Sequence, residues 1–150
     1  MFEKSQARLR LTEFCRRFEV EAVGGPRAPF HGFRLGRVNF LYRKACGSSV
    51  SGYPRWTWKE PMGKPKHRQH VQSVLLHGPK YKDFPERFFL IPLHKLNEKR
   101  PSHPRLEKEL NISADPIRPT GEITPFVYGY ELAENALRLY LDALRGNTGT

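Results

Sequence analysis

Acidic residues are nearly missing from one long stretch of this 150-residue sequence. Between Glu21 and Asp83 the only carboxylate is that of Glu60, whereas the same stretch holds twelve Lys or Arg and four His. Hydrolysis assisted by a divalent metal commonly needs two carboxylates as hard oxygen ligands. Residues 22–82 therefore cannot supply such a pair by themselves.

Other signals are missing as well, and each absence narrows the choice of function. The chain has no run of 18 apolar residues and no apolar leader after Met1, so we expect neither a membrane span nor export. A cytoplasmic location, or association with a bacterial nucleoid, follows as an expectation. We expect Cys15 and Cys46 to stay reduced there, with Cys15 a small core residue. No Gly-rich phosphate loop, nucleophile elbow or paired-histidine protease motif occurs.

The charge that is present is unevenly distributed. Residues 1–82, the basic half, carry 17 Lys or Arg against 5 Asp or Glu, a net charge of +12. Residues 83–150, the neutral half, carry 9 against 10, a net charge of −1. One-sided charge is typical of proteins that bind a polyanion, and we favour a nucleic acid. A merely basic surface, an anionic lipid and an acidic protein remain open as alternatives.

The pattern of apolar residues predicts one domain over residues 1–150, of α/β or α+β class, with a central mixed sheet flanked by an N-terminal and a C-terminal helix. Gly36 is expected to form the turn of a hairpin, and Glu13 to pair with Arg17 on the first helix. We expect residues 47–52 to form a loop and residues 60–70 a basic loop or a weak helical turn. The elements predicted are helices over 5–18 and 130–145, a hairpin over 33–42, and strands over 20–23, 55–59, 71–76 and 87–93.

Aromatic and basic residues alternate from Tyr53 to Arg68. Cations neutralise phosphates, and aromatic faces can stack on bases or sugars. For Trp56 and Trp58 we favour burial in the core over stacking, because large aromatic side chains usually pack inside. We interpret the cations as contacts to a phosphate backbone; the residues predicted to bind nucleic acid are Arg34, Arg37, Arg43, Lys44, Arg55, Trp56, Trp58, Lys59, Lys64, Lys66, His67 and Arg68.

Histidines at positions 67, 70 and 77 could in principle bind a metal. Structural zinc sites generally have two pairs of ligands at short spacing, and this sequence offers one such pair. We therefore favour histidines that face phosphate or lie in loops, and no metal is assigned.

The order of elements resembles the restriction-endonuclease-like superfamily, the PD-(D/E)XK nucleases. The similarity covers residues 5–96: a helix, a strand, the hairpin Phe33–Lys44, a Trp-containing strand, and the phrase Arg87–Pro92. The resemblance implies a restriction-endonuclease-like fold, with Lys44 at the catalytic lysine and Glu13 as an acid from the first helix. The acid expected two positions before the lysine is replaced by Tyr42, and the upstream aspartate is missing near 31–33.

Three functions stay open on the sequence. The first is a module that binds DNA or structured RNA through its phosphate backbone, without a cofactor, as a non-catalytic subunit of a larger nucleoprotein complex. The second is a magnesium-dependent DNA endonuclease with a rearranged site around Lys44 and Glu13. The third is an RNA-binding component of a ribonucleoprotein, and we favour the first.

Overall fold

The computed structural model describes residues 2–25, 27–50, 53–59, 69–80, 84–99, 111–114 and 124–148, and side chains over a smaller set. Its elements combine helices with a six-stranded mixed sheet and a second sheet of three strands. In chain order they are α1 (Phe2–Phe18), β1 (Glu21–Val23), β2 (Gly32–Leu35), β3 (Val38–Lys44), β4 (Cys46–Val50), β5 (Tyr53–Lys59), β6 (Ser73–Gly78), β7 (Arg87–Pro92), α2 (Leu93–Lys99), β8 (Asn111–Ala114), α4 (Thr124–Tyr128), β9 (Glu131–Leu132) and α5 (Glu134–Thr148).

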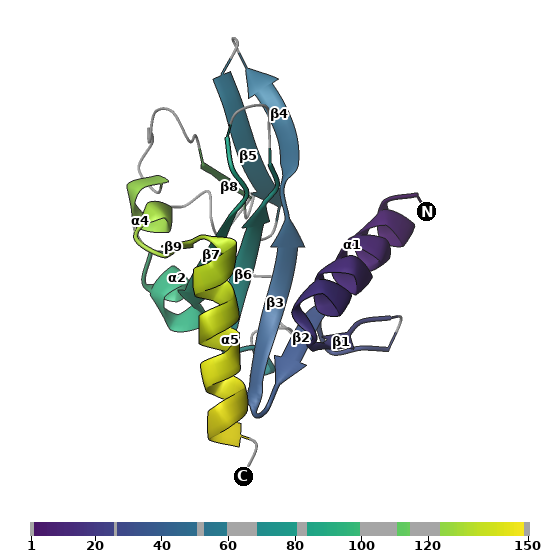
Figure 1. Ribbon diagram of the computed structural model, residues 1–150. Helices are drawn as coiled ribbons and strands as arrows, with labels where there is room; N and C mark the ends of the chain where they lie inside the picture. Colours follow the sequence, from purple (N-terminus) through teal and green to yellow (C-terminus); the bar gives the residue numbers. More distant parts are fainter. Residues whose placement is uncertain are drawn as a thin grey trace.

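The large sheet has the strand order β1-β2-β3-β6-β7-β9. Its neighbours are antiparallel except for β3 and β6, which run parallel with Lys44 opposite His77. The C-terminal ends of β3 and β6 therefore lie side by side at the same end of the sheet. The hairpin β4–β5 extends beyond that end of the sheet (Figure 1).

Two apolar layers cover the two faces of this sheet. On one face, Phe33, Phe40, Leu75 and Phe88 pack with α1 and α5. On the other face, residues of β6 and β7 pack against both tryptophans of β5 and against α2 and α4. Alternation of side chains along each strand explains why apolar residues run continuously through β6 and β7, since both of their faces are buried.

Gly32 allows the close approach of β2 and β3. A Cβ atom built on Gly32 would lie 1.8 Å from the carbonyl oxygen of Phe40 on the neighbouring strand. Backbone atoms cannot move away from such a contact without breaking the ladder, so a glycine is required at this position.

Most of the predicted elements are present, and the mixed α/β class with a central mixed sheet is confirmed. The hairpin turns at Gly36, which has φ of 63°, and the strand Arg87–Pro92 is internal and buried. The loop expected over 47–52 is wrong for Cys46–Val50, which pairs with β5. The C-terminal helix begins at Glu134 and not at 130, because residues 131–132 form β9 beside β7.

No helix among the described residues is long and apolar enough to span a membrane.

Candidate nucleic-acid interface

The two halves of the chain differ in the ion pairs that their charged side chains form. Every carboxylate that forms an ion pair between described side chains belongs to the neutral half; the pairs are Arg17–Glu86, Arg17–Glu134, His77–Glu86, Arg87–Glu131, Lys95–Glu98, Arg138–Glu134 and Arg145–Asp142. In the basic half, Arg17 and His77 have acidic partners. Within the described part of the chain, Arg8, Arg10 and Lys44 form no ion pair.

Several cations gather where β3 ends beside α1, and we call Arg8, Arg10, Arg43 and Lys44, with His31, the basic edge. The charges of Arg8 and Arg43 both act on His31. The charge of Arg10 acts on Tyr42, and that of Lys44 acts on His77, its neighbour across the β3–β6 ladder. Side chains from α1, the approach to β2 and β3 thus place positive charges around the end of β3, an arrangement that would attract an anionic ligand.

The predicted nucleic-acid contacts fall into two groups along β3. Arg43 and Lys44 belong to the basic edge, whereas Arg34 and Arg37 lie at the opposite end of the β2–β3 hairpin. Six residue steps along β3 separate Val38, next to Arg37, from Lys44, a distance of about 20 Å. Arg34 and Arg37 are exposed, and Arg34 Nε donates a hydrogen bond to Asn39 Oδ1 at 2.9 Å.

The strand β5 carries the next four predicted contacts. Trp56 and Trp58 have exposed fractions of 2% and 1%, so the preference for core packing is confirmed. Their rings are covered by protein, which corrects their inclusion among the predicted nucleic-acid contacts. The backbone positions of Arg55 and Lys59 are described as part of β5, but their side chains lie outside the described set; Lys64, Lys66, His67 and Arg68 lie outside the described residues altogether.

The indole groups of both tryptophans hold the hairpin β4–β5 against the end of β6. Trp58 Nε1 donates a hydrogen bond to the carbonyl of His77 at 3.1 Å, and Trp56 Nε1 donates to the carbonyl of Pro79 at 2.9 Å. A Cβ atom at Gly78 would lie 2.7 Å from the Trp56 ring. Only a glycine leaves room for this contact, so Gly78 fixes where the hairpin sits next to the basic edge.

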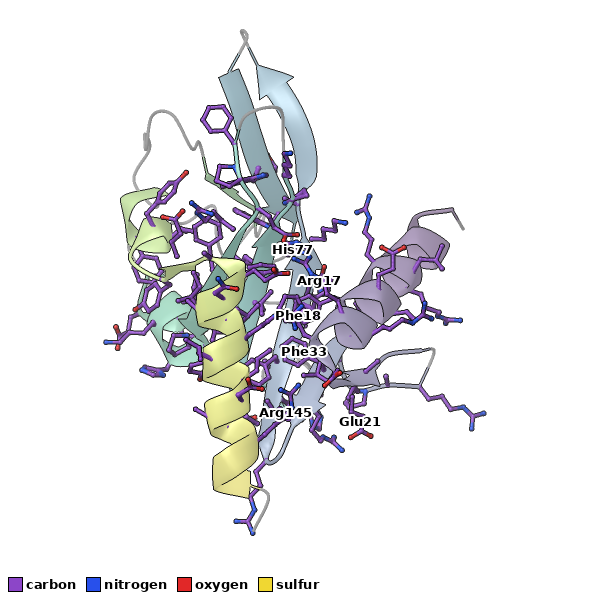
Figure 2. The ribbon with its side chains drawn as sticks, viewed as in Figure 1. Arg17, Phe18, Glu21, Phe33, His77 and Arg145 are labelled. Carbon is purple, nitrogen blue, oxygen red and sulfur yellow. The ribbon has the colours of Figure 1, made fainter. Side chains whose placement is uncertain are left out.

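Among the described side chains, none of the acids Glu13, Glu19 and Glu21 of the basic half forms an ion pair with Lys44. Glu13 is exposed on α1, and its expected partner Arg17 binds Glu86 and Glu134 instead, which corrects the Glu13–Arg17 pair. Glu19 follows the end of α1, and Glu21 pairs in register with Arg34 at the far end of the hairpin. Figure 2 shows Glu21 well away from His77. Among the described side chains no group of three or more His, Cys, Asp or Glu could hold a metal ion.

Beneath the basic edge lies a chain of hydrogen bonds that the sequence did not indicate. Tyr42 and His77 are buried, and Tyr42 Oη lies 2.7 Å from His77 Nδ1. His77 Nε2 lies 2.6 Å from Glu86 Oε2, and the guanidinium of Arg17 binds both oxygens of Glu86 at 2.9 and 2.6 Å. Arg17 Nε also donates to Glu134 at 2.9 Å. The network joins α1, β3, β6 and α5.

The protonation states of this network follow from burial and charge. Burial lowers the pKa of His77, and the charges of Lys44 and Arg17 lower it further against the opposing effect of Glu86. Burial raises the pKa of Tyr42, so its hydroxyl stays protonated. Burial disfavours the ionised form of Glu86, but hydrogen bonds from His77 and Arg17 outweigh this and lower its pKa to about 2. Neutral Tyr42 therefore donates to Nδ1 of neutral His77, whose Nε2–H donates to the Glu86 carboxylate.

This arrangement makes Tyr42, His77 and Glu86 structural groups beneath the basic edge. Phe88 stacks on the His77 ring with centroids 4.6 Å apart, and Phe14 packs on Tyr42 at 4.7 Å. Tyr42 thus packs directly beneath α1. The alternation of β3 places Tyr42 on the same face as Lys44, but it does not indicate which side chains Tyr42 contacts.

Comparisons of this chain with protein-family models, with curated proteins and with solved structures find no match.

Proposed function

We propose that this protein binds the phosphate backbone of a nucleic acid, DNA in preference to RNA, at the basic edge. The observation that carries the proposal is the set of cations Arg8, Arg10 and Lys44, which lie around the end of β3 without an acidic partner among the described residues. Cations held together without acids repel one another in the free protein. A polyanion relieves this repulsion and releases its own counterions on binding.

The proposal includes a binding role without cleavage, in a nucleoprotein complex and in the cytoplasm. The order of α1, β1 and the β2–β3 hairpin supports the restriction-endonuclease-like core that the resemblance implies. The position of the missing acid is taken by Tyr42, which is engaged with His77. A nuclease remains the competing hypothesis and predicts magnesium-dependent cutting of duplex or branched DNA that is lost in Lys44→Ala.

The test measures binding of a fluorescent 20-base-pair duplex by anisotropy over a series of salt concentrations. The logarithm of the binding constant should fall with the logarithm of salt at a slope of roughly −0.9 per neutralised phosphate. Replacing Arg10 and Lys44 by Ala should weaken binding about tenfold or more at moderate salt. The slope should become less steep by about 1.8, the value for two phosphate contacts. The same assay with structured RNA as competitor separates DNA from RNA.

Arg37→Ala is the matched control, because it removes one exposed cation from the far end of the same hairpin. If Arg37→Ala weakens binding as much as Lys44→Ala does, the contact extends along the whole hairpin and is not centred on the basic edge. Unchanged binding by the Arg10 and Lys44 double variant would contradict the proposal.

A further inference from the structure

The hairpin β4–β5 narrows to two strands towards its tip. The strand β8 pairs with β5 only from Trp56 to Lys59, so among the described residues Tyr53–Arg55 pair with β4 alone. Neighbouring strands of such a ribbon lie about 4.8 Å apart. Figure 1 shows the hairpin extending past the helices and the other strands at its end of the molecule. The tip is therefore a two-stranded ribbon that projects from the described fold.

Alternation along β5 gives this ribbon a core face and an outer face. Trp56 and Trp58 are buried in the core, so their positions define the core face. Successive positions of a strand lie on opposite faces of a sheet, so position 55 lies on the outer face. Ser48 is the register partner of Arg55 across the hairpin, and residues that pair across strands share a face. Arg55 and Ser48 therefore occupy neighbouring positions of the outer face.

The outer face of the hairpin continues the face of β3 that bears Lys44. A single residue, Ala45, separates β3 from β4, and it is buried in the same core cluster as Trp56. Gly47 is the register partner of Trp56, so Ala45 and Gly47 both belong to the core face. Lys44 and Ser48 alternate with them and belong to the outer face. Lys44 of the basic edge and the tip of the hairpin therefore lie on one continuous face.

This face is basic and rich in groups that form hydrogen bonds. None of the positions that the two ladders of the small sheet place on it is occupied by Asp or Glu, whereas Arg55 and Lys59 are basic. Ser48, Thr57 and Asn111 share the face and carry hydroxyl or amide groups. Such groups match the donors and acceptors that base pairs display in the major groove. Charge complementarity thus favours a polyanion that also offers polar base edges.

We propose that the hairpin β4–β5 lies in the major groove of duplex DNA, with Arg55 bound to a guanine and Lys44 bound to a phosphate that borders the groove. The major groove is about 12 Å wide and admits a two-stranded ribbon. An arginine guanidinium can donate to both O6 and N7 of guanine, the commonest specific contact in that groove. This inference rests on the proposed function, since it adds recognition of base sequence to binding of the phosphate backbone.

The spacing of Lys44 and Ser48 fits this placement. Four residue steps along an extended strand cover about 13 Å. That length is close to the width of the groove, so Lys44 can reach a bordering phosphate while the positions of Ser48 and Arg55 lie over base pairs. Trp56 and Trp58 are buried and cannot stack on unpaired bases, which favours a duplex over a single strand. The major groove of duplex RNA is too deep and narrow for side chains to read, so the inference applies to DNA.

The experiment selects binding sites for the full chain from a pool of DNA duplexes with a randomised central segment. We expect the wild type to enrich a short motif that contains at least one G·C pair. Affinities for a duplex with this motif and for a scrambled duplex are then measured by anisotropy at the same salt concentration. The ratio of the two affinities should fall about tenfold in Arg55→Ala, the effect expected when one bidentate contact to a base is lost.

Two further variants separate the reading of bases from the binding of phosphate. Lys44→Ala should weaken binding to both duplexes by the same factor and leave their ratio unchanged, because a phosphate contact carries no sequence information. Arg16→Ala removes an exposed arginine from the last turn of α1, outside the hairpin, and should also leave the ratio unchanged. Thermal melting checks that each variant is folded.

A modified duplex tests the contact without any change in the protein. Replacing the selected guanine by 7-deazaguanine removes the N7 acceptor from the major groove and leaves the phosphates and the base pairing intact. The wild type should bind this duplex more weakly than the unmodified one. Arg55→Ala should bind the two duplexes equally, because the donor to N7 is already missing.

The outcomes separate the two proposals. Absence of binding to every duplex would reject the nucleic-acid interface itself. Binding without an enriched motif, discrimination retained by Arg55→Ala, or a wild type indifferent to 7-deazaguanine would reject the reading of bases and leave the phosphate interface standing. Tighter binding to the single strand of the selected sequence than to its duplex would reject the placement in the major groove. Loss of discrimination in Arg55→Ala, together with weaker binding of the wild type to 7-deazaguanine, supports both.

Discussion

The two halves of the chain use their charged side chains differently. In the neutral half, Arg87, Arg138 and Arg145 bind acids of the same half and hold β9, α5 and the end of α1 in place. In the basic half, Arg8 and Lys44 have no acidic partner among the described residues. Arg17 is the exception in the basic half, because it binds Glu86 and Glu134 and so stabilises the fold. Otherwise the same residue types stabilise the fold in the neutral half and leave positive charge available to a ligand in the basic half. Variants of single residues can test this division.

The largest effect is expected at Glu86, the acid of the neutral half that binds Arg17 and His77. Glu86→Ala leaves both partners without their acceptor, and we expect a loss of about 2–3 kcal/mol in the free energy of unfolding, since hydrogen bonds to charged groups contribute about 1.5–3 kcal/mol each and this site is partly exposed. Urea denaturation at pH 7 measures it. Glu13→Ala, which removes an exposed acid of the basic half, should change stability by less than about 0.5 kcal/mol.

The contribution of the Glu86 carboxylate to the free energy of unfolding depends on pH in a direction that its pKa fixes. The pKa of Glu86 is lowered to about 2 in the folded protein, below its ordinary value of 4.5. Its contribution is therefore fully present above about pH 4.5 and is lost as the pH falls towards 2. The difference in stability between the wild type and Glu86→Gln should be largest at pH 7 and shrink on acidification. A difference that stays constant from pH 7 to pH 3 would show that the charge of Glu86 contributes nothing.

A moderate effect is expected at the C-terminal end of α1. Glu19 has φ of 56°, and the amide of Val20 donates to the carbonyl of Cys15 at 3.0 Å, the hydrogen bond of a Schellman motif. Arg145 of α5 donates to the carbonyls of Phe18 and Glu19. Phe18, Glu19 and Arg145 border a pocket of about 180 Å³ between the end of α1 and α5.

Arg145→Ala should lower the free energy of unfolding by about 1 kcal/mol, because carbonyls at the end of α1 lose their donor. Arg16→Ala, an exposed arginine in the last turn of α1, is the control and should have a smaller effect. Hydrogen exchange of the amides in α1 would localise the change. Equal losses in the two variants would mean that Arg145 does not act through these carbonyls.

Local sequence patterns predicted the strands in which the buried faces follow from the residues of the strand itself. The alternation of apolar residues predicted β3, and the continuous apolar run predicted that β7 is buried on both faces. The strand Cys46–Val50 was missed because its Gly and Ser residues are typical of loops, and its pairing with β5 comes from tertiary context. Helix α2 was missed because it is only seven residues long and follows Pro92 directly.

The site was predicted in part for a related reason. Lys44 and Arg43 were identified from the charge of the basic half, but Arg8 and His31 join them only because α1 crosses the end of β3. The network of Tyr42, His77 and Glu86 depends on partners 35 and 9 residues apart in sequence. No local pattern indicates which of several strands will lie side by side, so such contacts need the fold.

The smallest effects on stability are expected at the basic edge, and they should have the opposite sign. Removing a cation that faces other cations reduces repulsion, so Lys44→Ala should raise the free energy of unfolding by a few tenths of a kcal/mol at low salt. At about 0.5 M salt the screening length falls to a few ångströms and the gain should vanish. Arg87→Ala is the matched variant in the neutral half: it loses the bond from Nε to Glu131 at 3.0 Å and should be destabilised by about 0.5 kcal/mol at low salt. Urea denaturation of both variants at about 20 mM and 500 mM salt compares them, and a loss of stability in Lys44→Ala equal to that in Arg87→Ala would mean that the basic edge also holds the fold together.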